Sequence, residues 1–373
     1  MKKLLAIVLI LAMSLFAFTA CTQDQPVETP KTEEPKQEEP KQEEPKEEEP
    51  KTEEPKEEEE PLAEGAVKTG LAVVSSIEKS KDAGEKDGLA QTDSVIVAVT
   101  VDKDGKIVQT VIDTAQTKIE FSKDGKIVPD LNTVFKSKQE LKEEYGMNKA
   151  SSLGKEWYEQ ANALAEYVAG KTVEEVKAIA VDDTGVTTEV DLVSSVTIKI
   201  NPYKEAIEKA VANAQNLGAD ASDELGLGVV TTISKSKDAT ADKAGLAQAY
   251  STYTVATFDA DGKVTSSIID ASQANVEFDA AGKITTDLAV APITKVELGE
   301  AYGMKKASAI GKEWYEQADA FATYVVGKTV EEIKGIAIDE SGHATEEDLV
   351  SSVTVGIEDF QSNLEKAFNN ASI

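Results

Sequence analysis

Two threonines have the surroundings of a covalent attachment site, because each ends the same seven-residue motif. The motif Asp-Leu-Val-Ser-Ser-Val-Thr occupies residues 191–197 and again residues 348–354, an offset of 157 residues. In both copies the threonine, Thr197 or Thr354, follows two small serines, which leave room for a modifying enzyme. A threonine hydroxyl is a weak nucleophile without a neighbouring base, and the motif contains none. We therefore expect both hydroxyls on exposed turns, where an outside enzyme supplies the base.

The repeat extends far beyond the motif and defines the domain organisation. Gly146 matches Gly303 and Trp157 matches Trp314 at the same offset, which falls to 156 further upstream. This period is much longer than the roughly 20–50 residues of a solenoid repeat. It indicates two tandem homologous domains, 66–217 and 222–373, each long enough to bury a core.

Alternating and β-branched segments predict strands in the first half of each repeat. In the first copy they lie at 70–77, 94–101, 107–113 and 118–121. The turn signal Asp102 to Lys106 joins two of them as a hairpin, and a Lys-Asp-Gly turn at 123–125 predicts a second hairpin.

The second half of each repeat has the periodicity of helices. Helices are expected at 141–145 and 154–169, where Gly170 stops the second one. A capping box at Thr172 starts a short helix, and Asn201-Pro202 is a good N-cap and N1 pair for a last helix to about 214. The expected fold class is α+β, with an antiparallel sheet of hairpins followed by helices in each domain.

The chain begins with an export signal. Two lysines precede an apolar run from Leu4 to Phe18, followed by small residues and Cys21. This pattern predicts a signal peptide over 1–20, and the run is shorter than the roughly 20 residues of a spanning helix. Cys21, the only cysteine, resembles the lipidated residue of a bacterial lipobox, which would anchor the protein by lipid on the outer face of the cell membrane. The alternative is a soluble secreted protein with a chance cysteine.

Residues 22–61 have the composition of an unfolded tether. They contain eight of the eleven prolines, with 17 acidic residues against 6 lysines. Without apolar surface to bury, such a segment stays disordered, and like charges extend it. We interpret 21–61 as a lipidated cysteine and a linker that holds the domains away from the membrane.

Composition argues against several functions. His343 is the only histidine and the chain has no arginine, so Ser-His-Asp or Cys-His catalysis is not expected. Zinc sites built from histidine and cysteine are not expected either. The net charge of −30 argues against nucleic acid and against direct binding to anionic lipid. We expect no catalytic residue, no metal site and a surface role for His343.

The order of strands, helices and heptapeptide resembles the FMN-binding domain of flavinylated bacterial membrane and surface proteins. In that family a motif close to Asp-Xaa-Xaa-Ser-Gly-Ala-Thr precedes the last helix. The whole layout is similar to the two-domain FMN-binding lipoproteins of Gram-positive extracellular electron transfer. The resemblance covers about 66–373.

The resemblance implies a cofactor, two acceptors and a set of partners. A flavin transferase that uses FAD and Mg²⁺ would attach one FMN to Thr197 and one to Thr354. Electrons would pass from a membrane quinone and NADH dehydrogenase system to extracellular acceptors, so the chain would be an electron-transfer protein rather than an enzyme. The other motif positions implied as cofactor-binding are Asp191, Ser194, Ser195, Asp348, Ser351 and Ser352.

Three alternatives remain open from the residues alone. Trp157 and Trp314 are candidates to stack on the flavin ring, yet a tryptophan on a helical stripe is also ordinary core. The heptapeptide also fits an ordinary strand with its threonine facing solvent. The whole protein also fits a surface binding or adhesion lipoprotein whose tandem domains display a ligand-binding face.

Overall fold

A computed structural model describes residues 62–371. The predicted signal peptide, Cys21 and the tether of 22–61 lie outside the described residues. Within 62–371, no helix has the length and apolar character needed to cross a membrane.

Each repeat contains a three-stranded antiparallel sheet whose strands follow one another in space as in the sequence. The strands are β1 (Lys68–Ser76), β2 (Gly88–Val101), β3 (Ile107–Phe121), β4 (Glu224–Thr232), β5 (Gly245–Phe258) and β6 (Val264–Phe278). The predicted turn between β2 and β3 forms as expected, because Asp102 Oδ1 accepts hydrogen bonds from the amides of Asp104 and Lys106.

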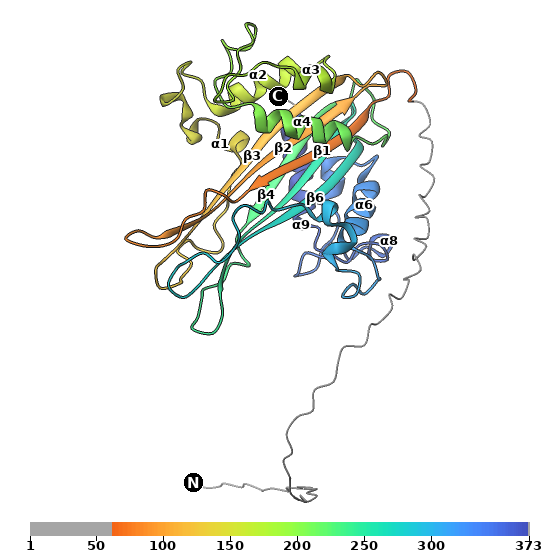
Figure 1. The fold of residues 1–373 in the computed structure, drawn as a ribbon. Helices are drawn as coiled ribbons and strands as arrows, with labels where there is room; N and C mark the ends of the chain where they lie inside the picture. Colours follow the sequence, from red (N-terminus) through yellow and green to blue (C-terminus); the bar gives the residue numbers. More distant parts are fainter. Residues whose placement is uncertain (1–61, 372–373) are drawn as a thin grey trace, which may run out of the picture. The chain divides into compact units, whose positions relative to one another are not determined.

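Helices follow each sheet, so the expected α+β fold with two similar halves is confirmed (Figure 1). The first repeat has α1 (Lys138–Leu141), the 3₁₀ helices η1 (Lys142–Tyr145) and η2 (Met147–Lys149), α2 (Trp157–Val168), α3 (Val173–Lys177) and α4 (Asn201–Ala212). The second has α5 (Lys295–Leu298), η3 (Gly299–Tyr302), α6 (Trp314–Val325), α7 (Val330–Lys334), α8 (Glu347–Val350) and α9 (Glu358–Ala371). The capping box at Thr172 is present, while the N-cap position of α4 is Ile200 rather than Asn201 and no side chain caps this helix.

The prediction of two separate strands at 107–113 and 118–121 was wrong. Both belong to the single 15-residue strand β3. After the turn at 123–125 the chain forms an isolated β-bridge between Phe121 and Ile127 instead of the second strand of a hairpin. In the sequence alone, the polar residues between the two segments predict an interruption of the strand. They stay in the strand because their backbone pairs with β2 and because the carboxylate of Asp113 accepts the amides of Thr114 and Gln139.

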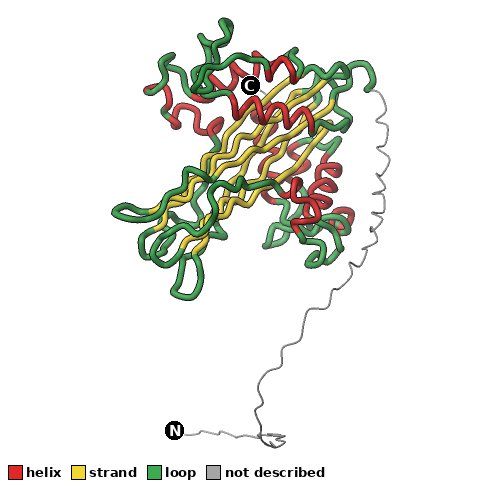
Figure 2. The backbone as a smooth tube through the Cα atoms, in the orientation of Figure 1, coloured by secondary structure: helices red, strands yellow, loops and turns green. Residues whose placement is uncertain are grey.

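The two faces of each sheet have different neighbours. On β2, Val97 and Val99 pack against the helices of their own repeat, whereas Ile96 and Ala98 pack against the other sheet. The side chains alternate because successive residues of a strand point to opposite faces. The unit is therefore layered as helices, sheet, sheet and helices, and Figure 2 shows the strands between two groups of helices.

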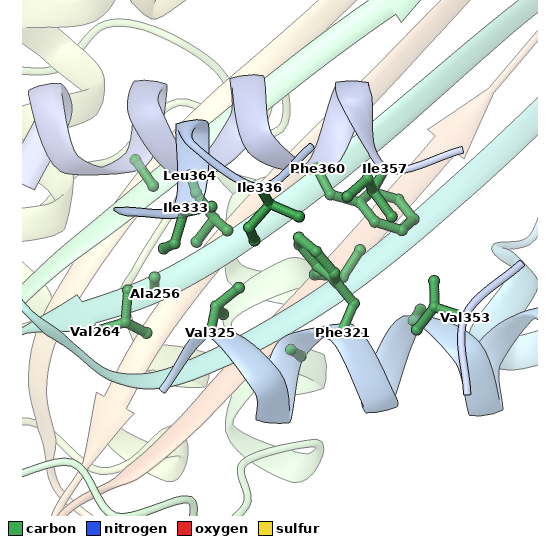
Figure 3. Close-up of a cluster of buried hydrophobic side chains, with 14 of the residues drawn as sticks. Ala256, Val264, Phe321, Val325, Ile333, Ile336, Val353, Ile357, Phe360 and Leu364 are labelled. Atoms are coloured by element: carbon green, nitrogen blue, oxygen red, sulfur yellow. The ribbon is translucent and has the colours of Figure 1, made fainter. Parts of the chain in front are cut away.

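Each repeat has a helical core of its own. In the second repeat, Phe321 and Val325 of α6 point toward Phe360 and Leu364 of α9 (Figure 3). Val353 of the heptapeptide belongs to the same cluster. The matching cluster of the first repeat includes Val196, so the motif is tied to the core in both copies.

Two further clusters are shared by the repeats, and their contacts occur in pairs related by the repeat. Phe121 and Phe278 stack with ring centroids 4.2 Å apart. The amide of Ala83 donates to the carbonyl of Gly282 (2.8 Å), and the amide of Ala239 donates to that of Gly125 (2.7 Å). This exchange of equivalent contacts has the form of an approximate two-fold axis between the sheets.

Two ion pairs cross between the repeats in the same paired way. Lys209 of α4 contacts Glu297 of α5, and Lys366 of α9 contacts Glu140 of α1. Each lysine also donates to a strand carbonyl of its own repeat, that of Val73 or Val229. The last helix of each repeat is therefore bound to the first helix of the other.

The last helix of each repeat also lies very close to the first strand. A Cβ atom on Gly70 of β1 would overlap the carbonyl oxygen of Ala210 in α4, and one on Gly226 of β4 would overlap that of Ala367 in α9. Only glycine permits this approach. It sets the position of α4, which begins shortly after Thr197.

Candidate functional site

The heptapeptide of the first repeat folds as a helical turn. The amides of Val193 and Val196 donate to the carbonyls of Glu189 and Leu192 at 2.9 Å, and Thr197 follows this turn directly. In the second repeat the same residues include α8. The alternative interpretation of the motif as an ordinary strand was therefore wrong.

The motif is held by its apolar residues. Leu192 and Val196 are buried in the core, and Leu349 and Val353 are buried in the second copy. Among the predicted motif residues, Asp191, Asp348, Ser194 and Ser351 are exposed, and Ser195 and Ser352 are half-buried. The turn thus exposes its aspartate and first serine, while the two buried side chains fix its position. The expected exposure of the acceptor hydroxyls is only partial, because Thr197 and Thr354 are half-buried.

Each predicted acceptor threonine is held by a buried glutamine. Gln160 Oε1 accepts from the amide of Thr197 at 2.7 Å and from its hydroxyl at 3.1 Å. Gln317 makes the same two contacts with Thr354, at 2.8 and 3.1 Å. A neutral amide oxygen positions the hydroxyl but is too weakly basic to take its proton. The chain therefore orients the acceptor without activating it.

Thr197 opens onto a cavity of about 670 Å³. Trp157, Tyr145 and Tyr203 lie in its lining, together with the half-buried Met147. A volume of this size lies within the range of small-molecule and cofactor sites, roughly 300–1,000 Å³. Asp191, Ser194 and Ser195 are not in the lining, so the structure brings Thr197 and Trp157 together but leaves those three outside.

Trp157 serves the core and lines the cavity. Its side chain is 2 % exposed, and Nε1 donates to the Tyr203 hydroxyl at 2.9 Å. The two rings lie with centroids 6.2 Å apart, tilted by 51°. Trp314 is buried in the same way and meets Phe360 edge-on at 6.0 Å. The core interpretation of both tryptophans is correct, and Trp157 also forms one wall of a cavity.

Three lysines and three carboxylates line the cavity, which are Lys79, Lys138 and Lys199 against Glu78, Asp93 and Glu205. Lys138 and Lys199 line it, and the Lys138 Nζ lies 4.6 Å from the centroid of Tyr145. Lys79 and Asp93 line it too and pair at 2.9 Å. The charges of the lining therefore balance, and its lysines, on an aromatic cavity beside a hydroxyl, are suited to a planar ligand that carries a phosphate.

Asp113 fixes the short helix that carries Lys138. Its carboxylate accepts the amide of Gln139 at 3.1 Å, one of the first amides of α1. Burial raises the pKa of Asp113 to about 6, and burial of the equivalent Asp270 has the same effect. Both carboxylates hold helix N-termini against their sheets.

The second repeat fills the corresponding position with side chains. Tyr250 stands where the first repeat has Asp93, and the Lys295 Nζ donates to its hydroxyl at 3.1 Å. The same Nζ lies 4.7 Å from the ring centroids of Tyr250, Tyr302 and Trp314. Lys295 is only 4 % exposed, and burial lowers its pKa to about 8.

Four residues of this site were not identified from the sequence. Gln160 and Gln317 end the repeated string Gly-Lys-Glu-Trp-Tyr-Glu-Gln, so an uncharged polar residue on an otherwise apolar helix stripe was the available signal. No sequence signal marked Asp93 or Tyr203, because the strand β2 and the helix α4 bring them to the cavity from distant parts of the chain.

Comparisons with known proteins leave the family open. No family model matches the chain, and no solved structure matches it. A chlorophenol reductase of Desulfitobacterium hafniense is 51 % identical over 41 residues, which is 11 % of this chain and 12 % of the reductase. The chain thus shares a short segment with a small part of that protein.

Replacing Gln160 by leucine is expected to remove the two hydrogen bonds that hold Thr197 in place. The leucine has a similar volume but no acceptor, so the amide of the half-buried Thr197 loses its partner at a cost of about 1 kcal/mol or more. The melting temperature should fall accordingly, and amide exchange at Thr197 should quicken. Gln317→Leu is the matched control, because it should quicken exchange at Thr354 and leave Thr197 unchanged; wild-type exchange at Thr197 in Gln160→Leu would contradict the assigned role.

Proposed function

We propose that this protein carries FMN covalently on Thr197 and Thr354 and transfers electrons at the outer face of the cell membrane. The observation that carries the proposal is the position of Thr197 on an aromatic, lysine-bearing cavity beside a repeated motif. FMN has a planar ring that suits stacking on aromatic side chains and a phosphate that suits lysine.

The attachment is a phosphoryl-transfer reaction performed by another enzyme. The Thr197 oxygen attacks the flavin-side phosphorus of FAD, the bond to the AMP phosphate breaks, and AMP leaves. The hydroxyl proton goes to a base of the transferase, whose Mg²⁺ stabilises the charge on the phosphates. The product is a phosphodiester between threonine and riboflavin, with no net oxidation. The neutral contact with Gln160 fits this division, since this chain orients the hydroxyl and the partner activates it.

The bound flavin supplies the redox chemistry, and the chain supplies its housing. The proposed donors are a membrane quinone and NADH dehydrogenase system, and the proposed acceptors are extracellular, such as ferric iron or soluble flavin. Covalent attachment suits a protein outside the cell, where a dissociated cofactor would be lost by diffusion. A lipid on Cys21 and the acidic tether would keep the two domains near the donor and extend them toward acceptors.

The experiment is to produce the chain with a flavin transferase and FAD and to measure its intact mass. The wild type should gain two FMN groups, and the yellow colour should survive denaturation and gel filtration. Thr197→Ala and Thr354→Ala should each lose one group, and the double variant should lose both. Thr188→Ala and Thr345→Ala are matched controls, because these exposed threonines lie outside the motif and both acceptor hydroxyls are kept.

The main competing function is a non-redox surface binding or adhesion lipoprotein. It would give a colourless protein of unmodified mass from the native cell surface. Retention of both flavins in the double threonine variant would instead leave a flavoprotein but remove the site assignment.

A further inference from the structure

We propose, building on the function above, that the two flavin sites are unequal. The ring of a flavin on Thr197 is enclosed by the cavity of the first repeat, whereas Tyr250 and Lys295 occupy that place in the second. A flavin on Thr354 therefore keeps its ring at the protein surface.

The two acceptor threonines are equivalent, so the difference lies in the residues that surround the flavin ring. Thr197 and Thr354 are both half-buried, and both contact a buried glutamine at nearly the same distances. A transferase that recognises the turn and its hydroxyl meets the same geometry twice. Both sites should accept FMN.

The sheet position that lines the first cavity is filled in the second repeat. Asp93 of β2 lies between Ser76 and Gln116 in the sheet, and all three line the cavity. Tyr250 holds the same register on β5, between Thr232 and Gln273. Its ring packs against the helical core of the second repeat, so a compact carboxylate is replaced by an aromatic ring at the position of the cavity.

The lysine beside this position reinforces the difference. In the first repeat Lys138 is half-buried and its Nζ lies 5.2 Å from the Trp157 ring. In the second, Lys295 is buried and its ammonium lies against three aromatic rings and the Tyr250 hydroxyl. A flavin ring entering there would have to displace both a buried cation and its aromatic partners, which breaks the three cation–π contacts of Lys295.

The test uses the full chain loaded by transferase and FAD, with one acceptor removed at a time. Thr354→Ala leaves the flavin on Thr197, which should fluoresce weakly because aromatic side chains stack on it, resist quenching by iodide and show induced circular dichroism in the visible flavin bands. Thr197→Ala leaves the flavin on Thr354, which should be brighter, several-fold more sensitive to iodide and nearly without visible circular dichroism.

Two exchanges of the key residue make the assignment specific. Adding Asp93→Tyr to Thr354→Ala should expose the remaining flavin, and adding Tyr250→Asp to Thr197→Ala should shield it. Thermal unfolding of each variant confirms that the chain is folded, and either exchange alone is sufficient if the other prevents folding.

The outcomes separate this inference from the proposed function. Equal shielding and equal circular dichroism of the two single flavins, with one FMN per chain in each variant, would overturn the inference and leave the function standing. A chain without FMN at either threonine would overturn both.

Discussion

Gly70→Val should be among the most damaging single substitutions in this protein, although the position lies in an ordinary strand. The first atom of the new side chain overlaps the Ala210 carbonyl, so α4 must move away from β1. Such overpacking costs about 3 kcal/mol or more when the obstacle is backbone. The melting temperature should fall by about 5–10 °C.

The displacement should also reach the cavity, since α4 carries Tyr203 and begins just after Thr197. Modification of Thr197 by transferase and FAD should therefore fall, while Thr354 is affected less. Gly84→Ala is the matched control, because nothing lies within 4 Å of the added carbon. A Gly70→Val variant with wild-type melting temperature would show that α4 is not held at this distance.

Excising the first repeat should remove the folded monomer. The segment 66–217 would expose the sheet face formed by residues that now contact the other repeat, which are Leu71, Val73, Ile96 and Ala98. It would also lose the stacking partner of Phe121 and the amide and carbonyl partners near Ala83 and Gly125. Removing several buried apolar side chains from contact costs about 1.5–3 kcal/mol for each large one, which is comparable with the whole stability of a domain.

The purified segment should therefore unfold, aggregate or pair with a second copy through the exposed face. Sedimentation and thermal unfolding at several protein concentrations distinguish these states from a folded monomer. Co-production with 222–373 should restore a folded heterodimer. A soluble monomeric repeat with cooperative unfolding near that of the full chain would contradict the importance of the shared clusters.

The sequence predicted the fold class well because its signals are local. Turn residues such as Asp102 and Gly105, and the capping box at Thr172, act within a few residues and needed no knowledge of tertiary contacts. Because the sequence is repeated, each of these local signals could be checked in two copies. The continuity of β3 could not be read in this way, because Asp113 is kept in the strand by an amide of α1, 26 residues away.

The site was only partly predictable for a related reason. The heptapeptide identified Thr197 and Thr354, but its own strand-like pattern of apolar residues reflects two anchors of a turn, Leu192 and Val196. The cavity depends on which residues of β2, α1, α2 and α4 face one another. The difference between Asp93 and Tyr250 can be related to the cavity only when the sheet register is known.

The crossed ion pairs connect the helices that lie beside the two sites. Lys209 of α4 contacts Glu297 on α5, two residues from Lys295, while Lys366 of α9 contacts Glu140 on α1, two residues from Lys138. A rearrangement that moves α5 at the second site would also displace the ion-pair partner of Lys209 in α4. Amide exchange in α4 should quicken when Tyr250→Asp loosens α5, and unaltered exchange there would show that each half responds alone.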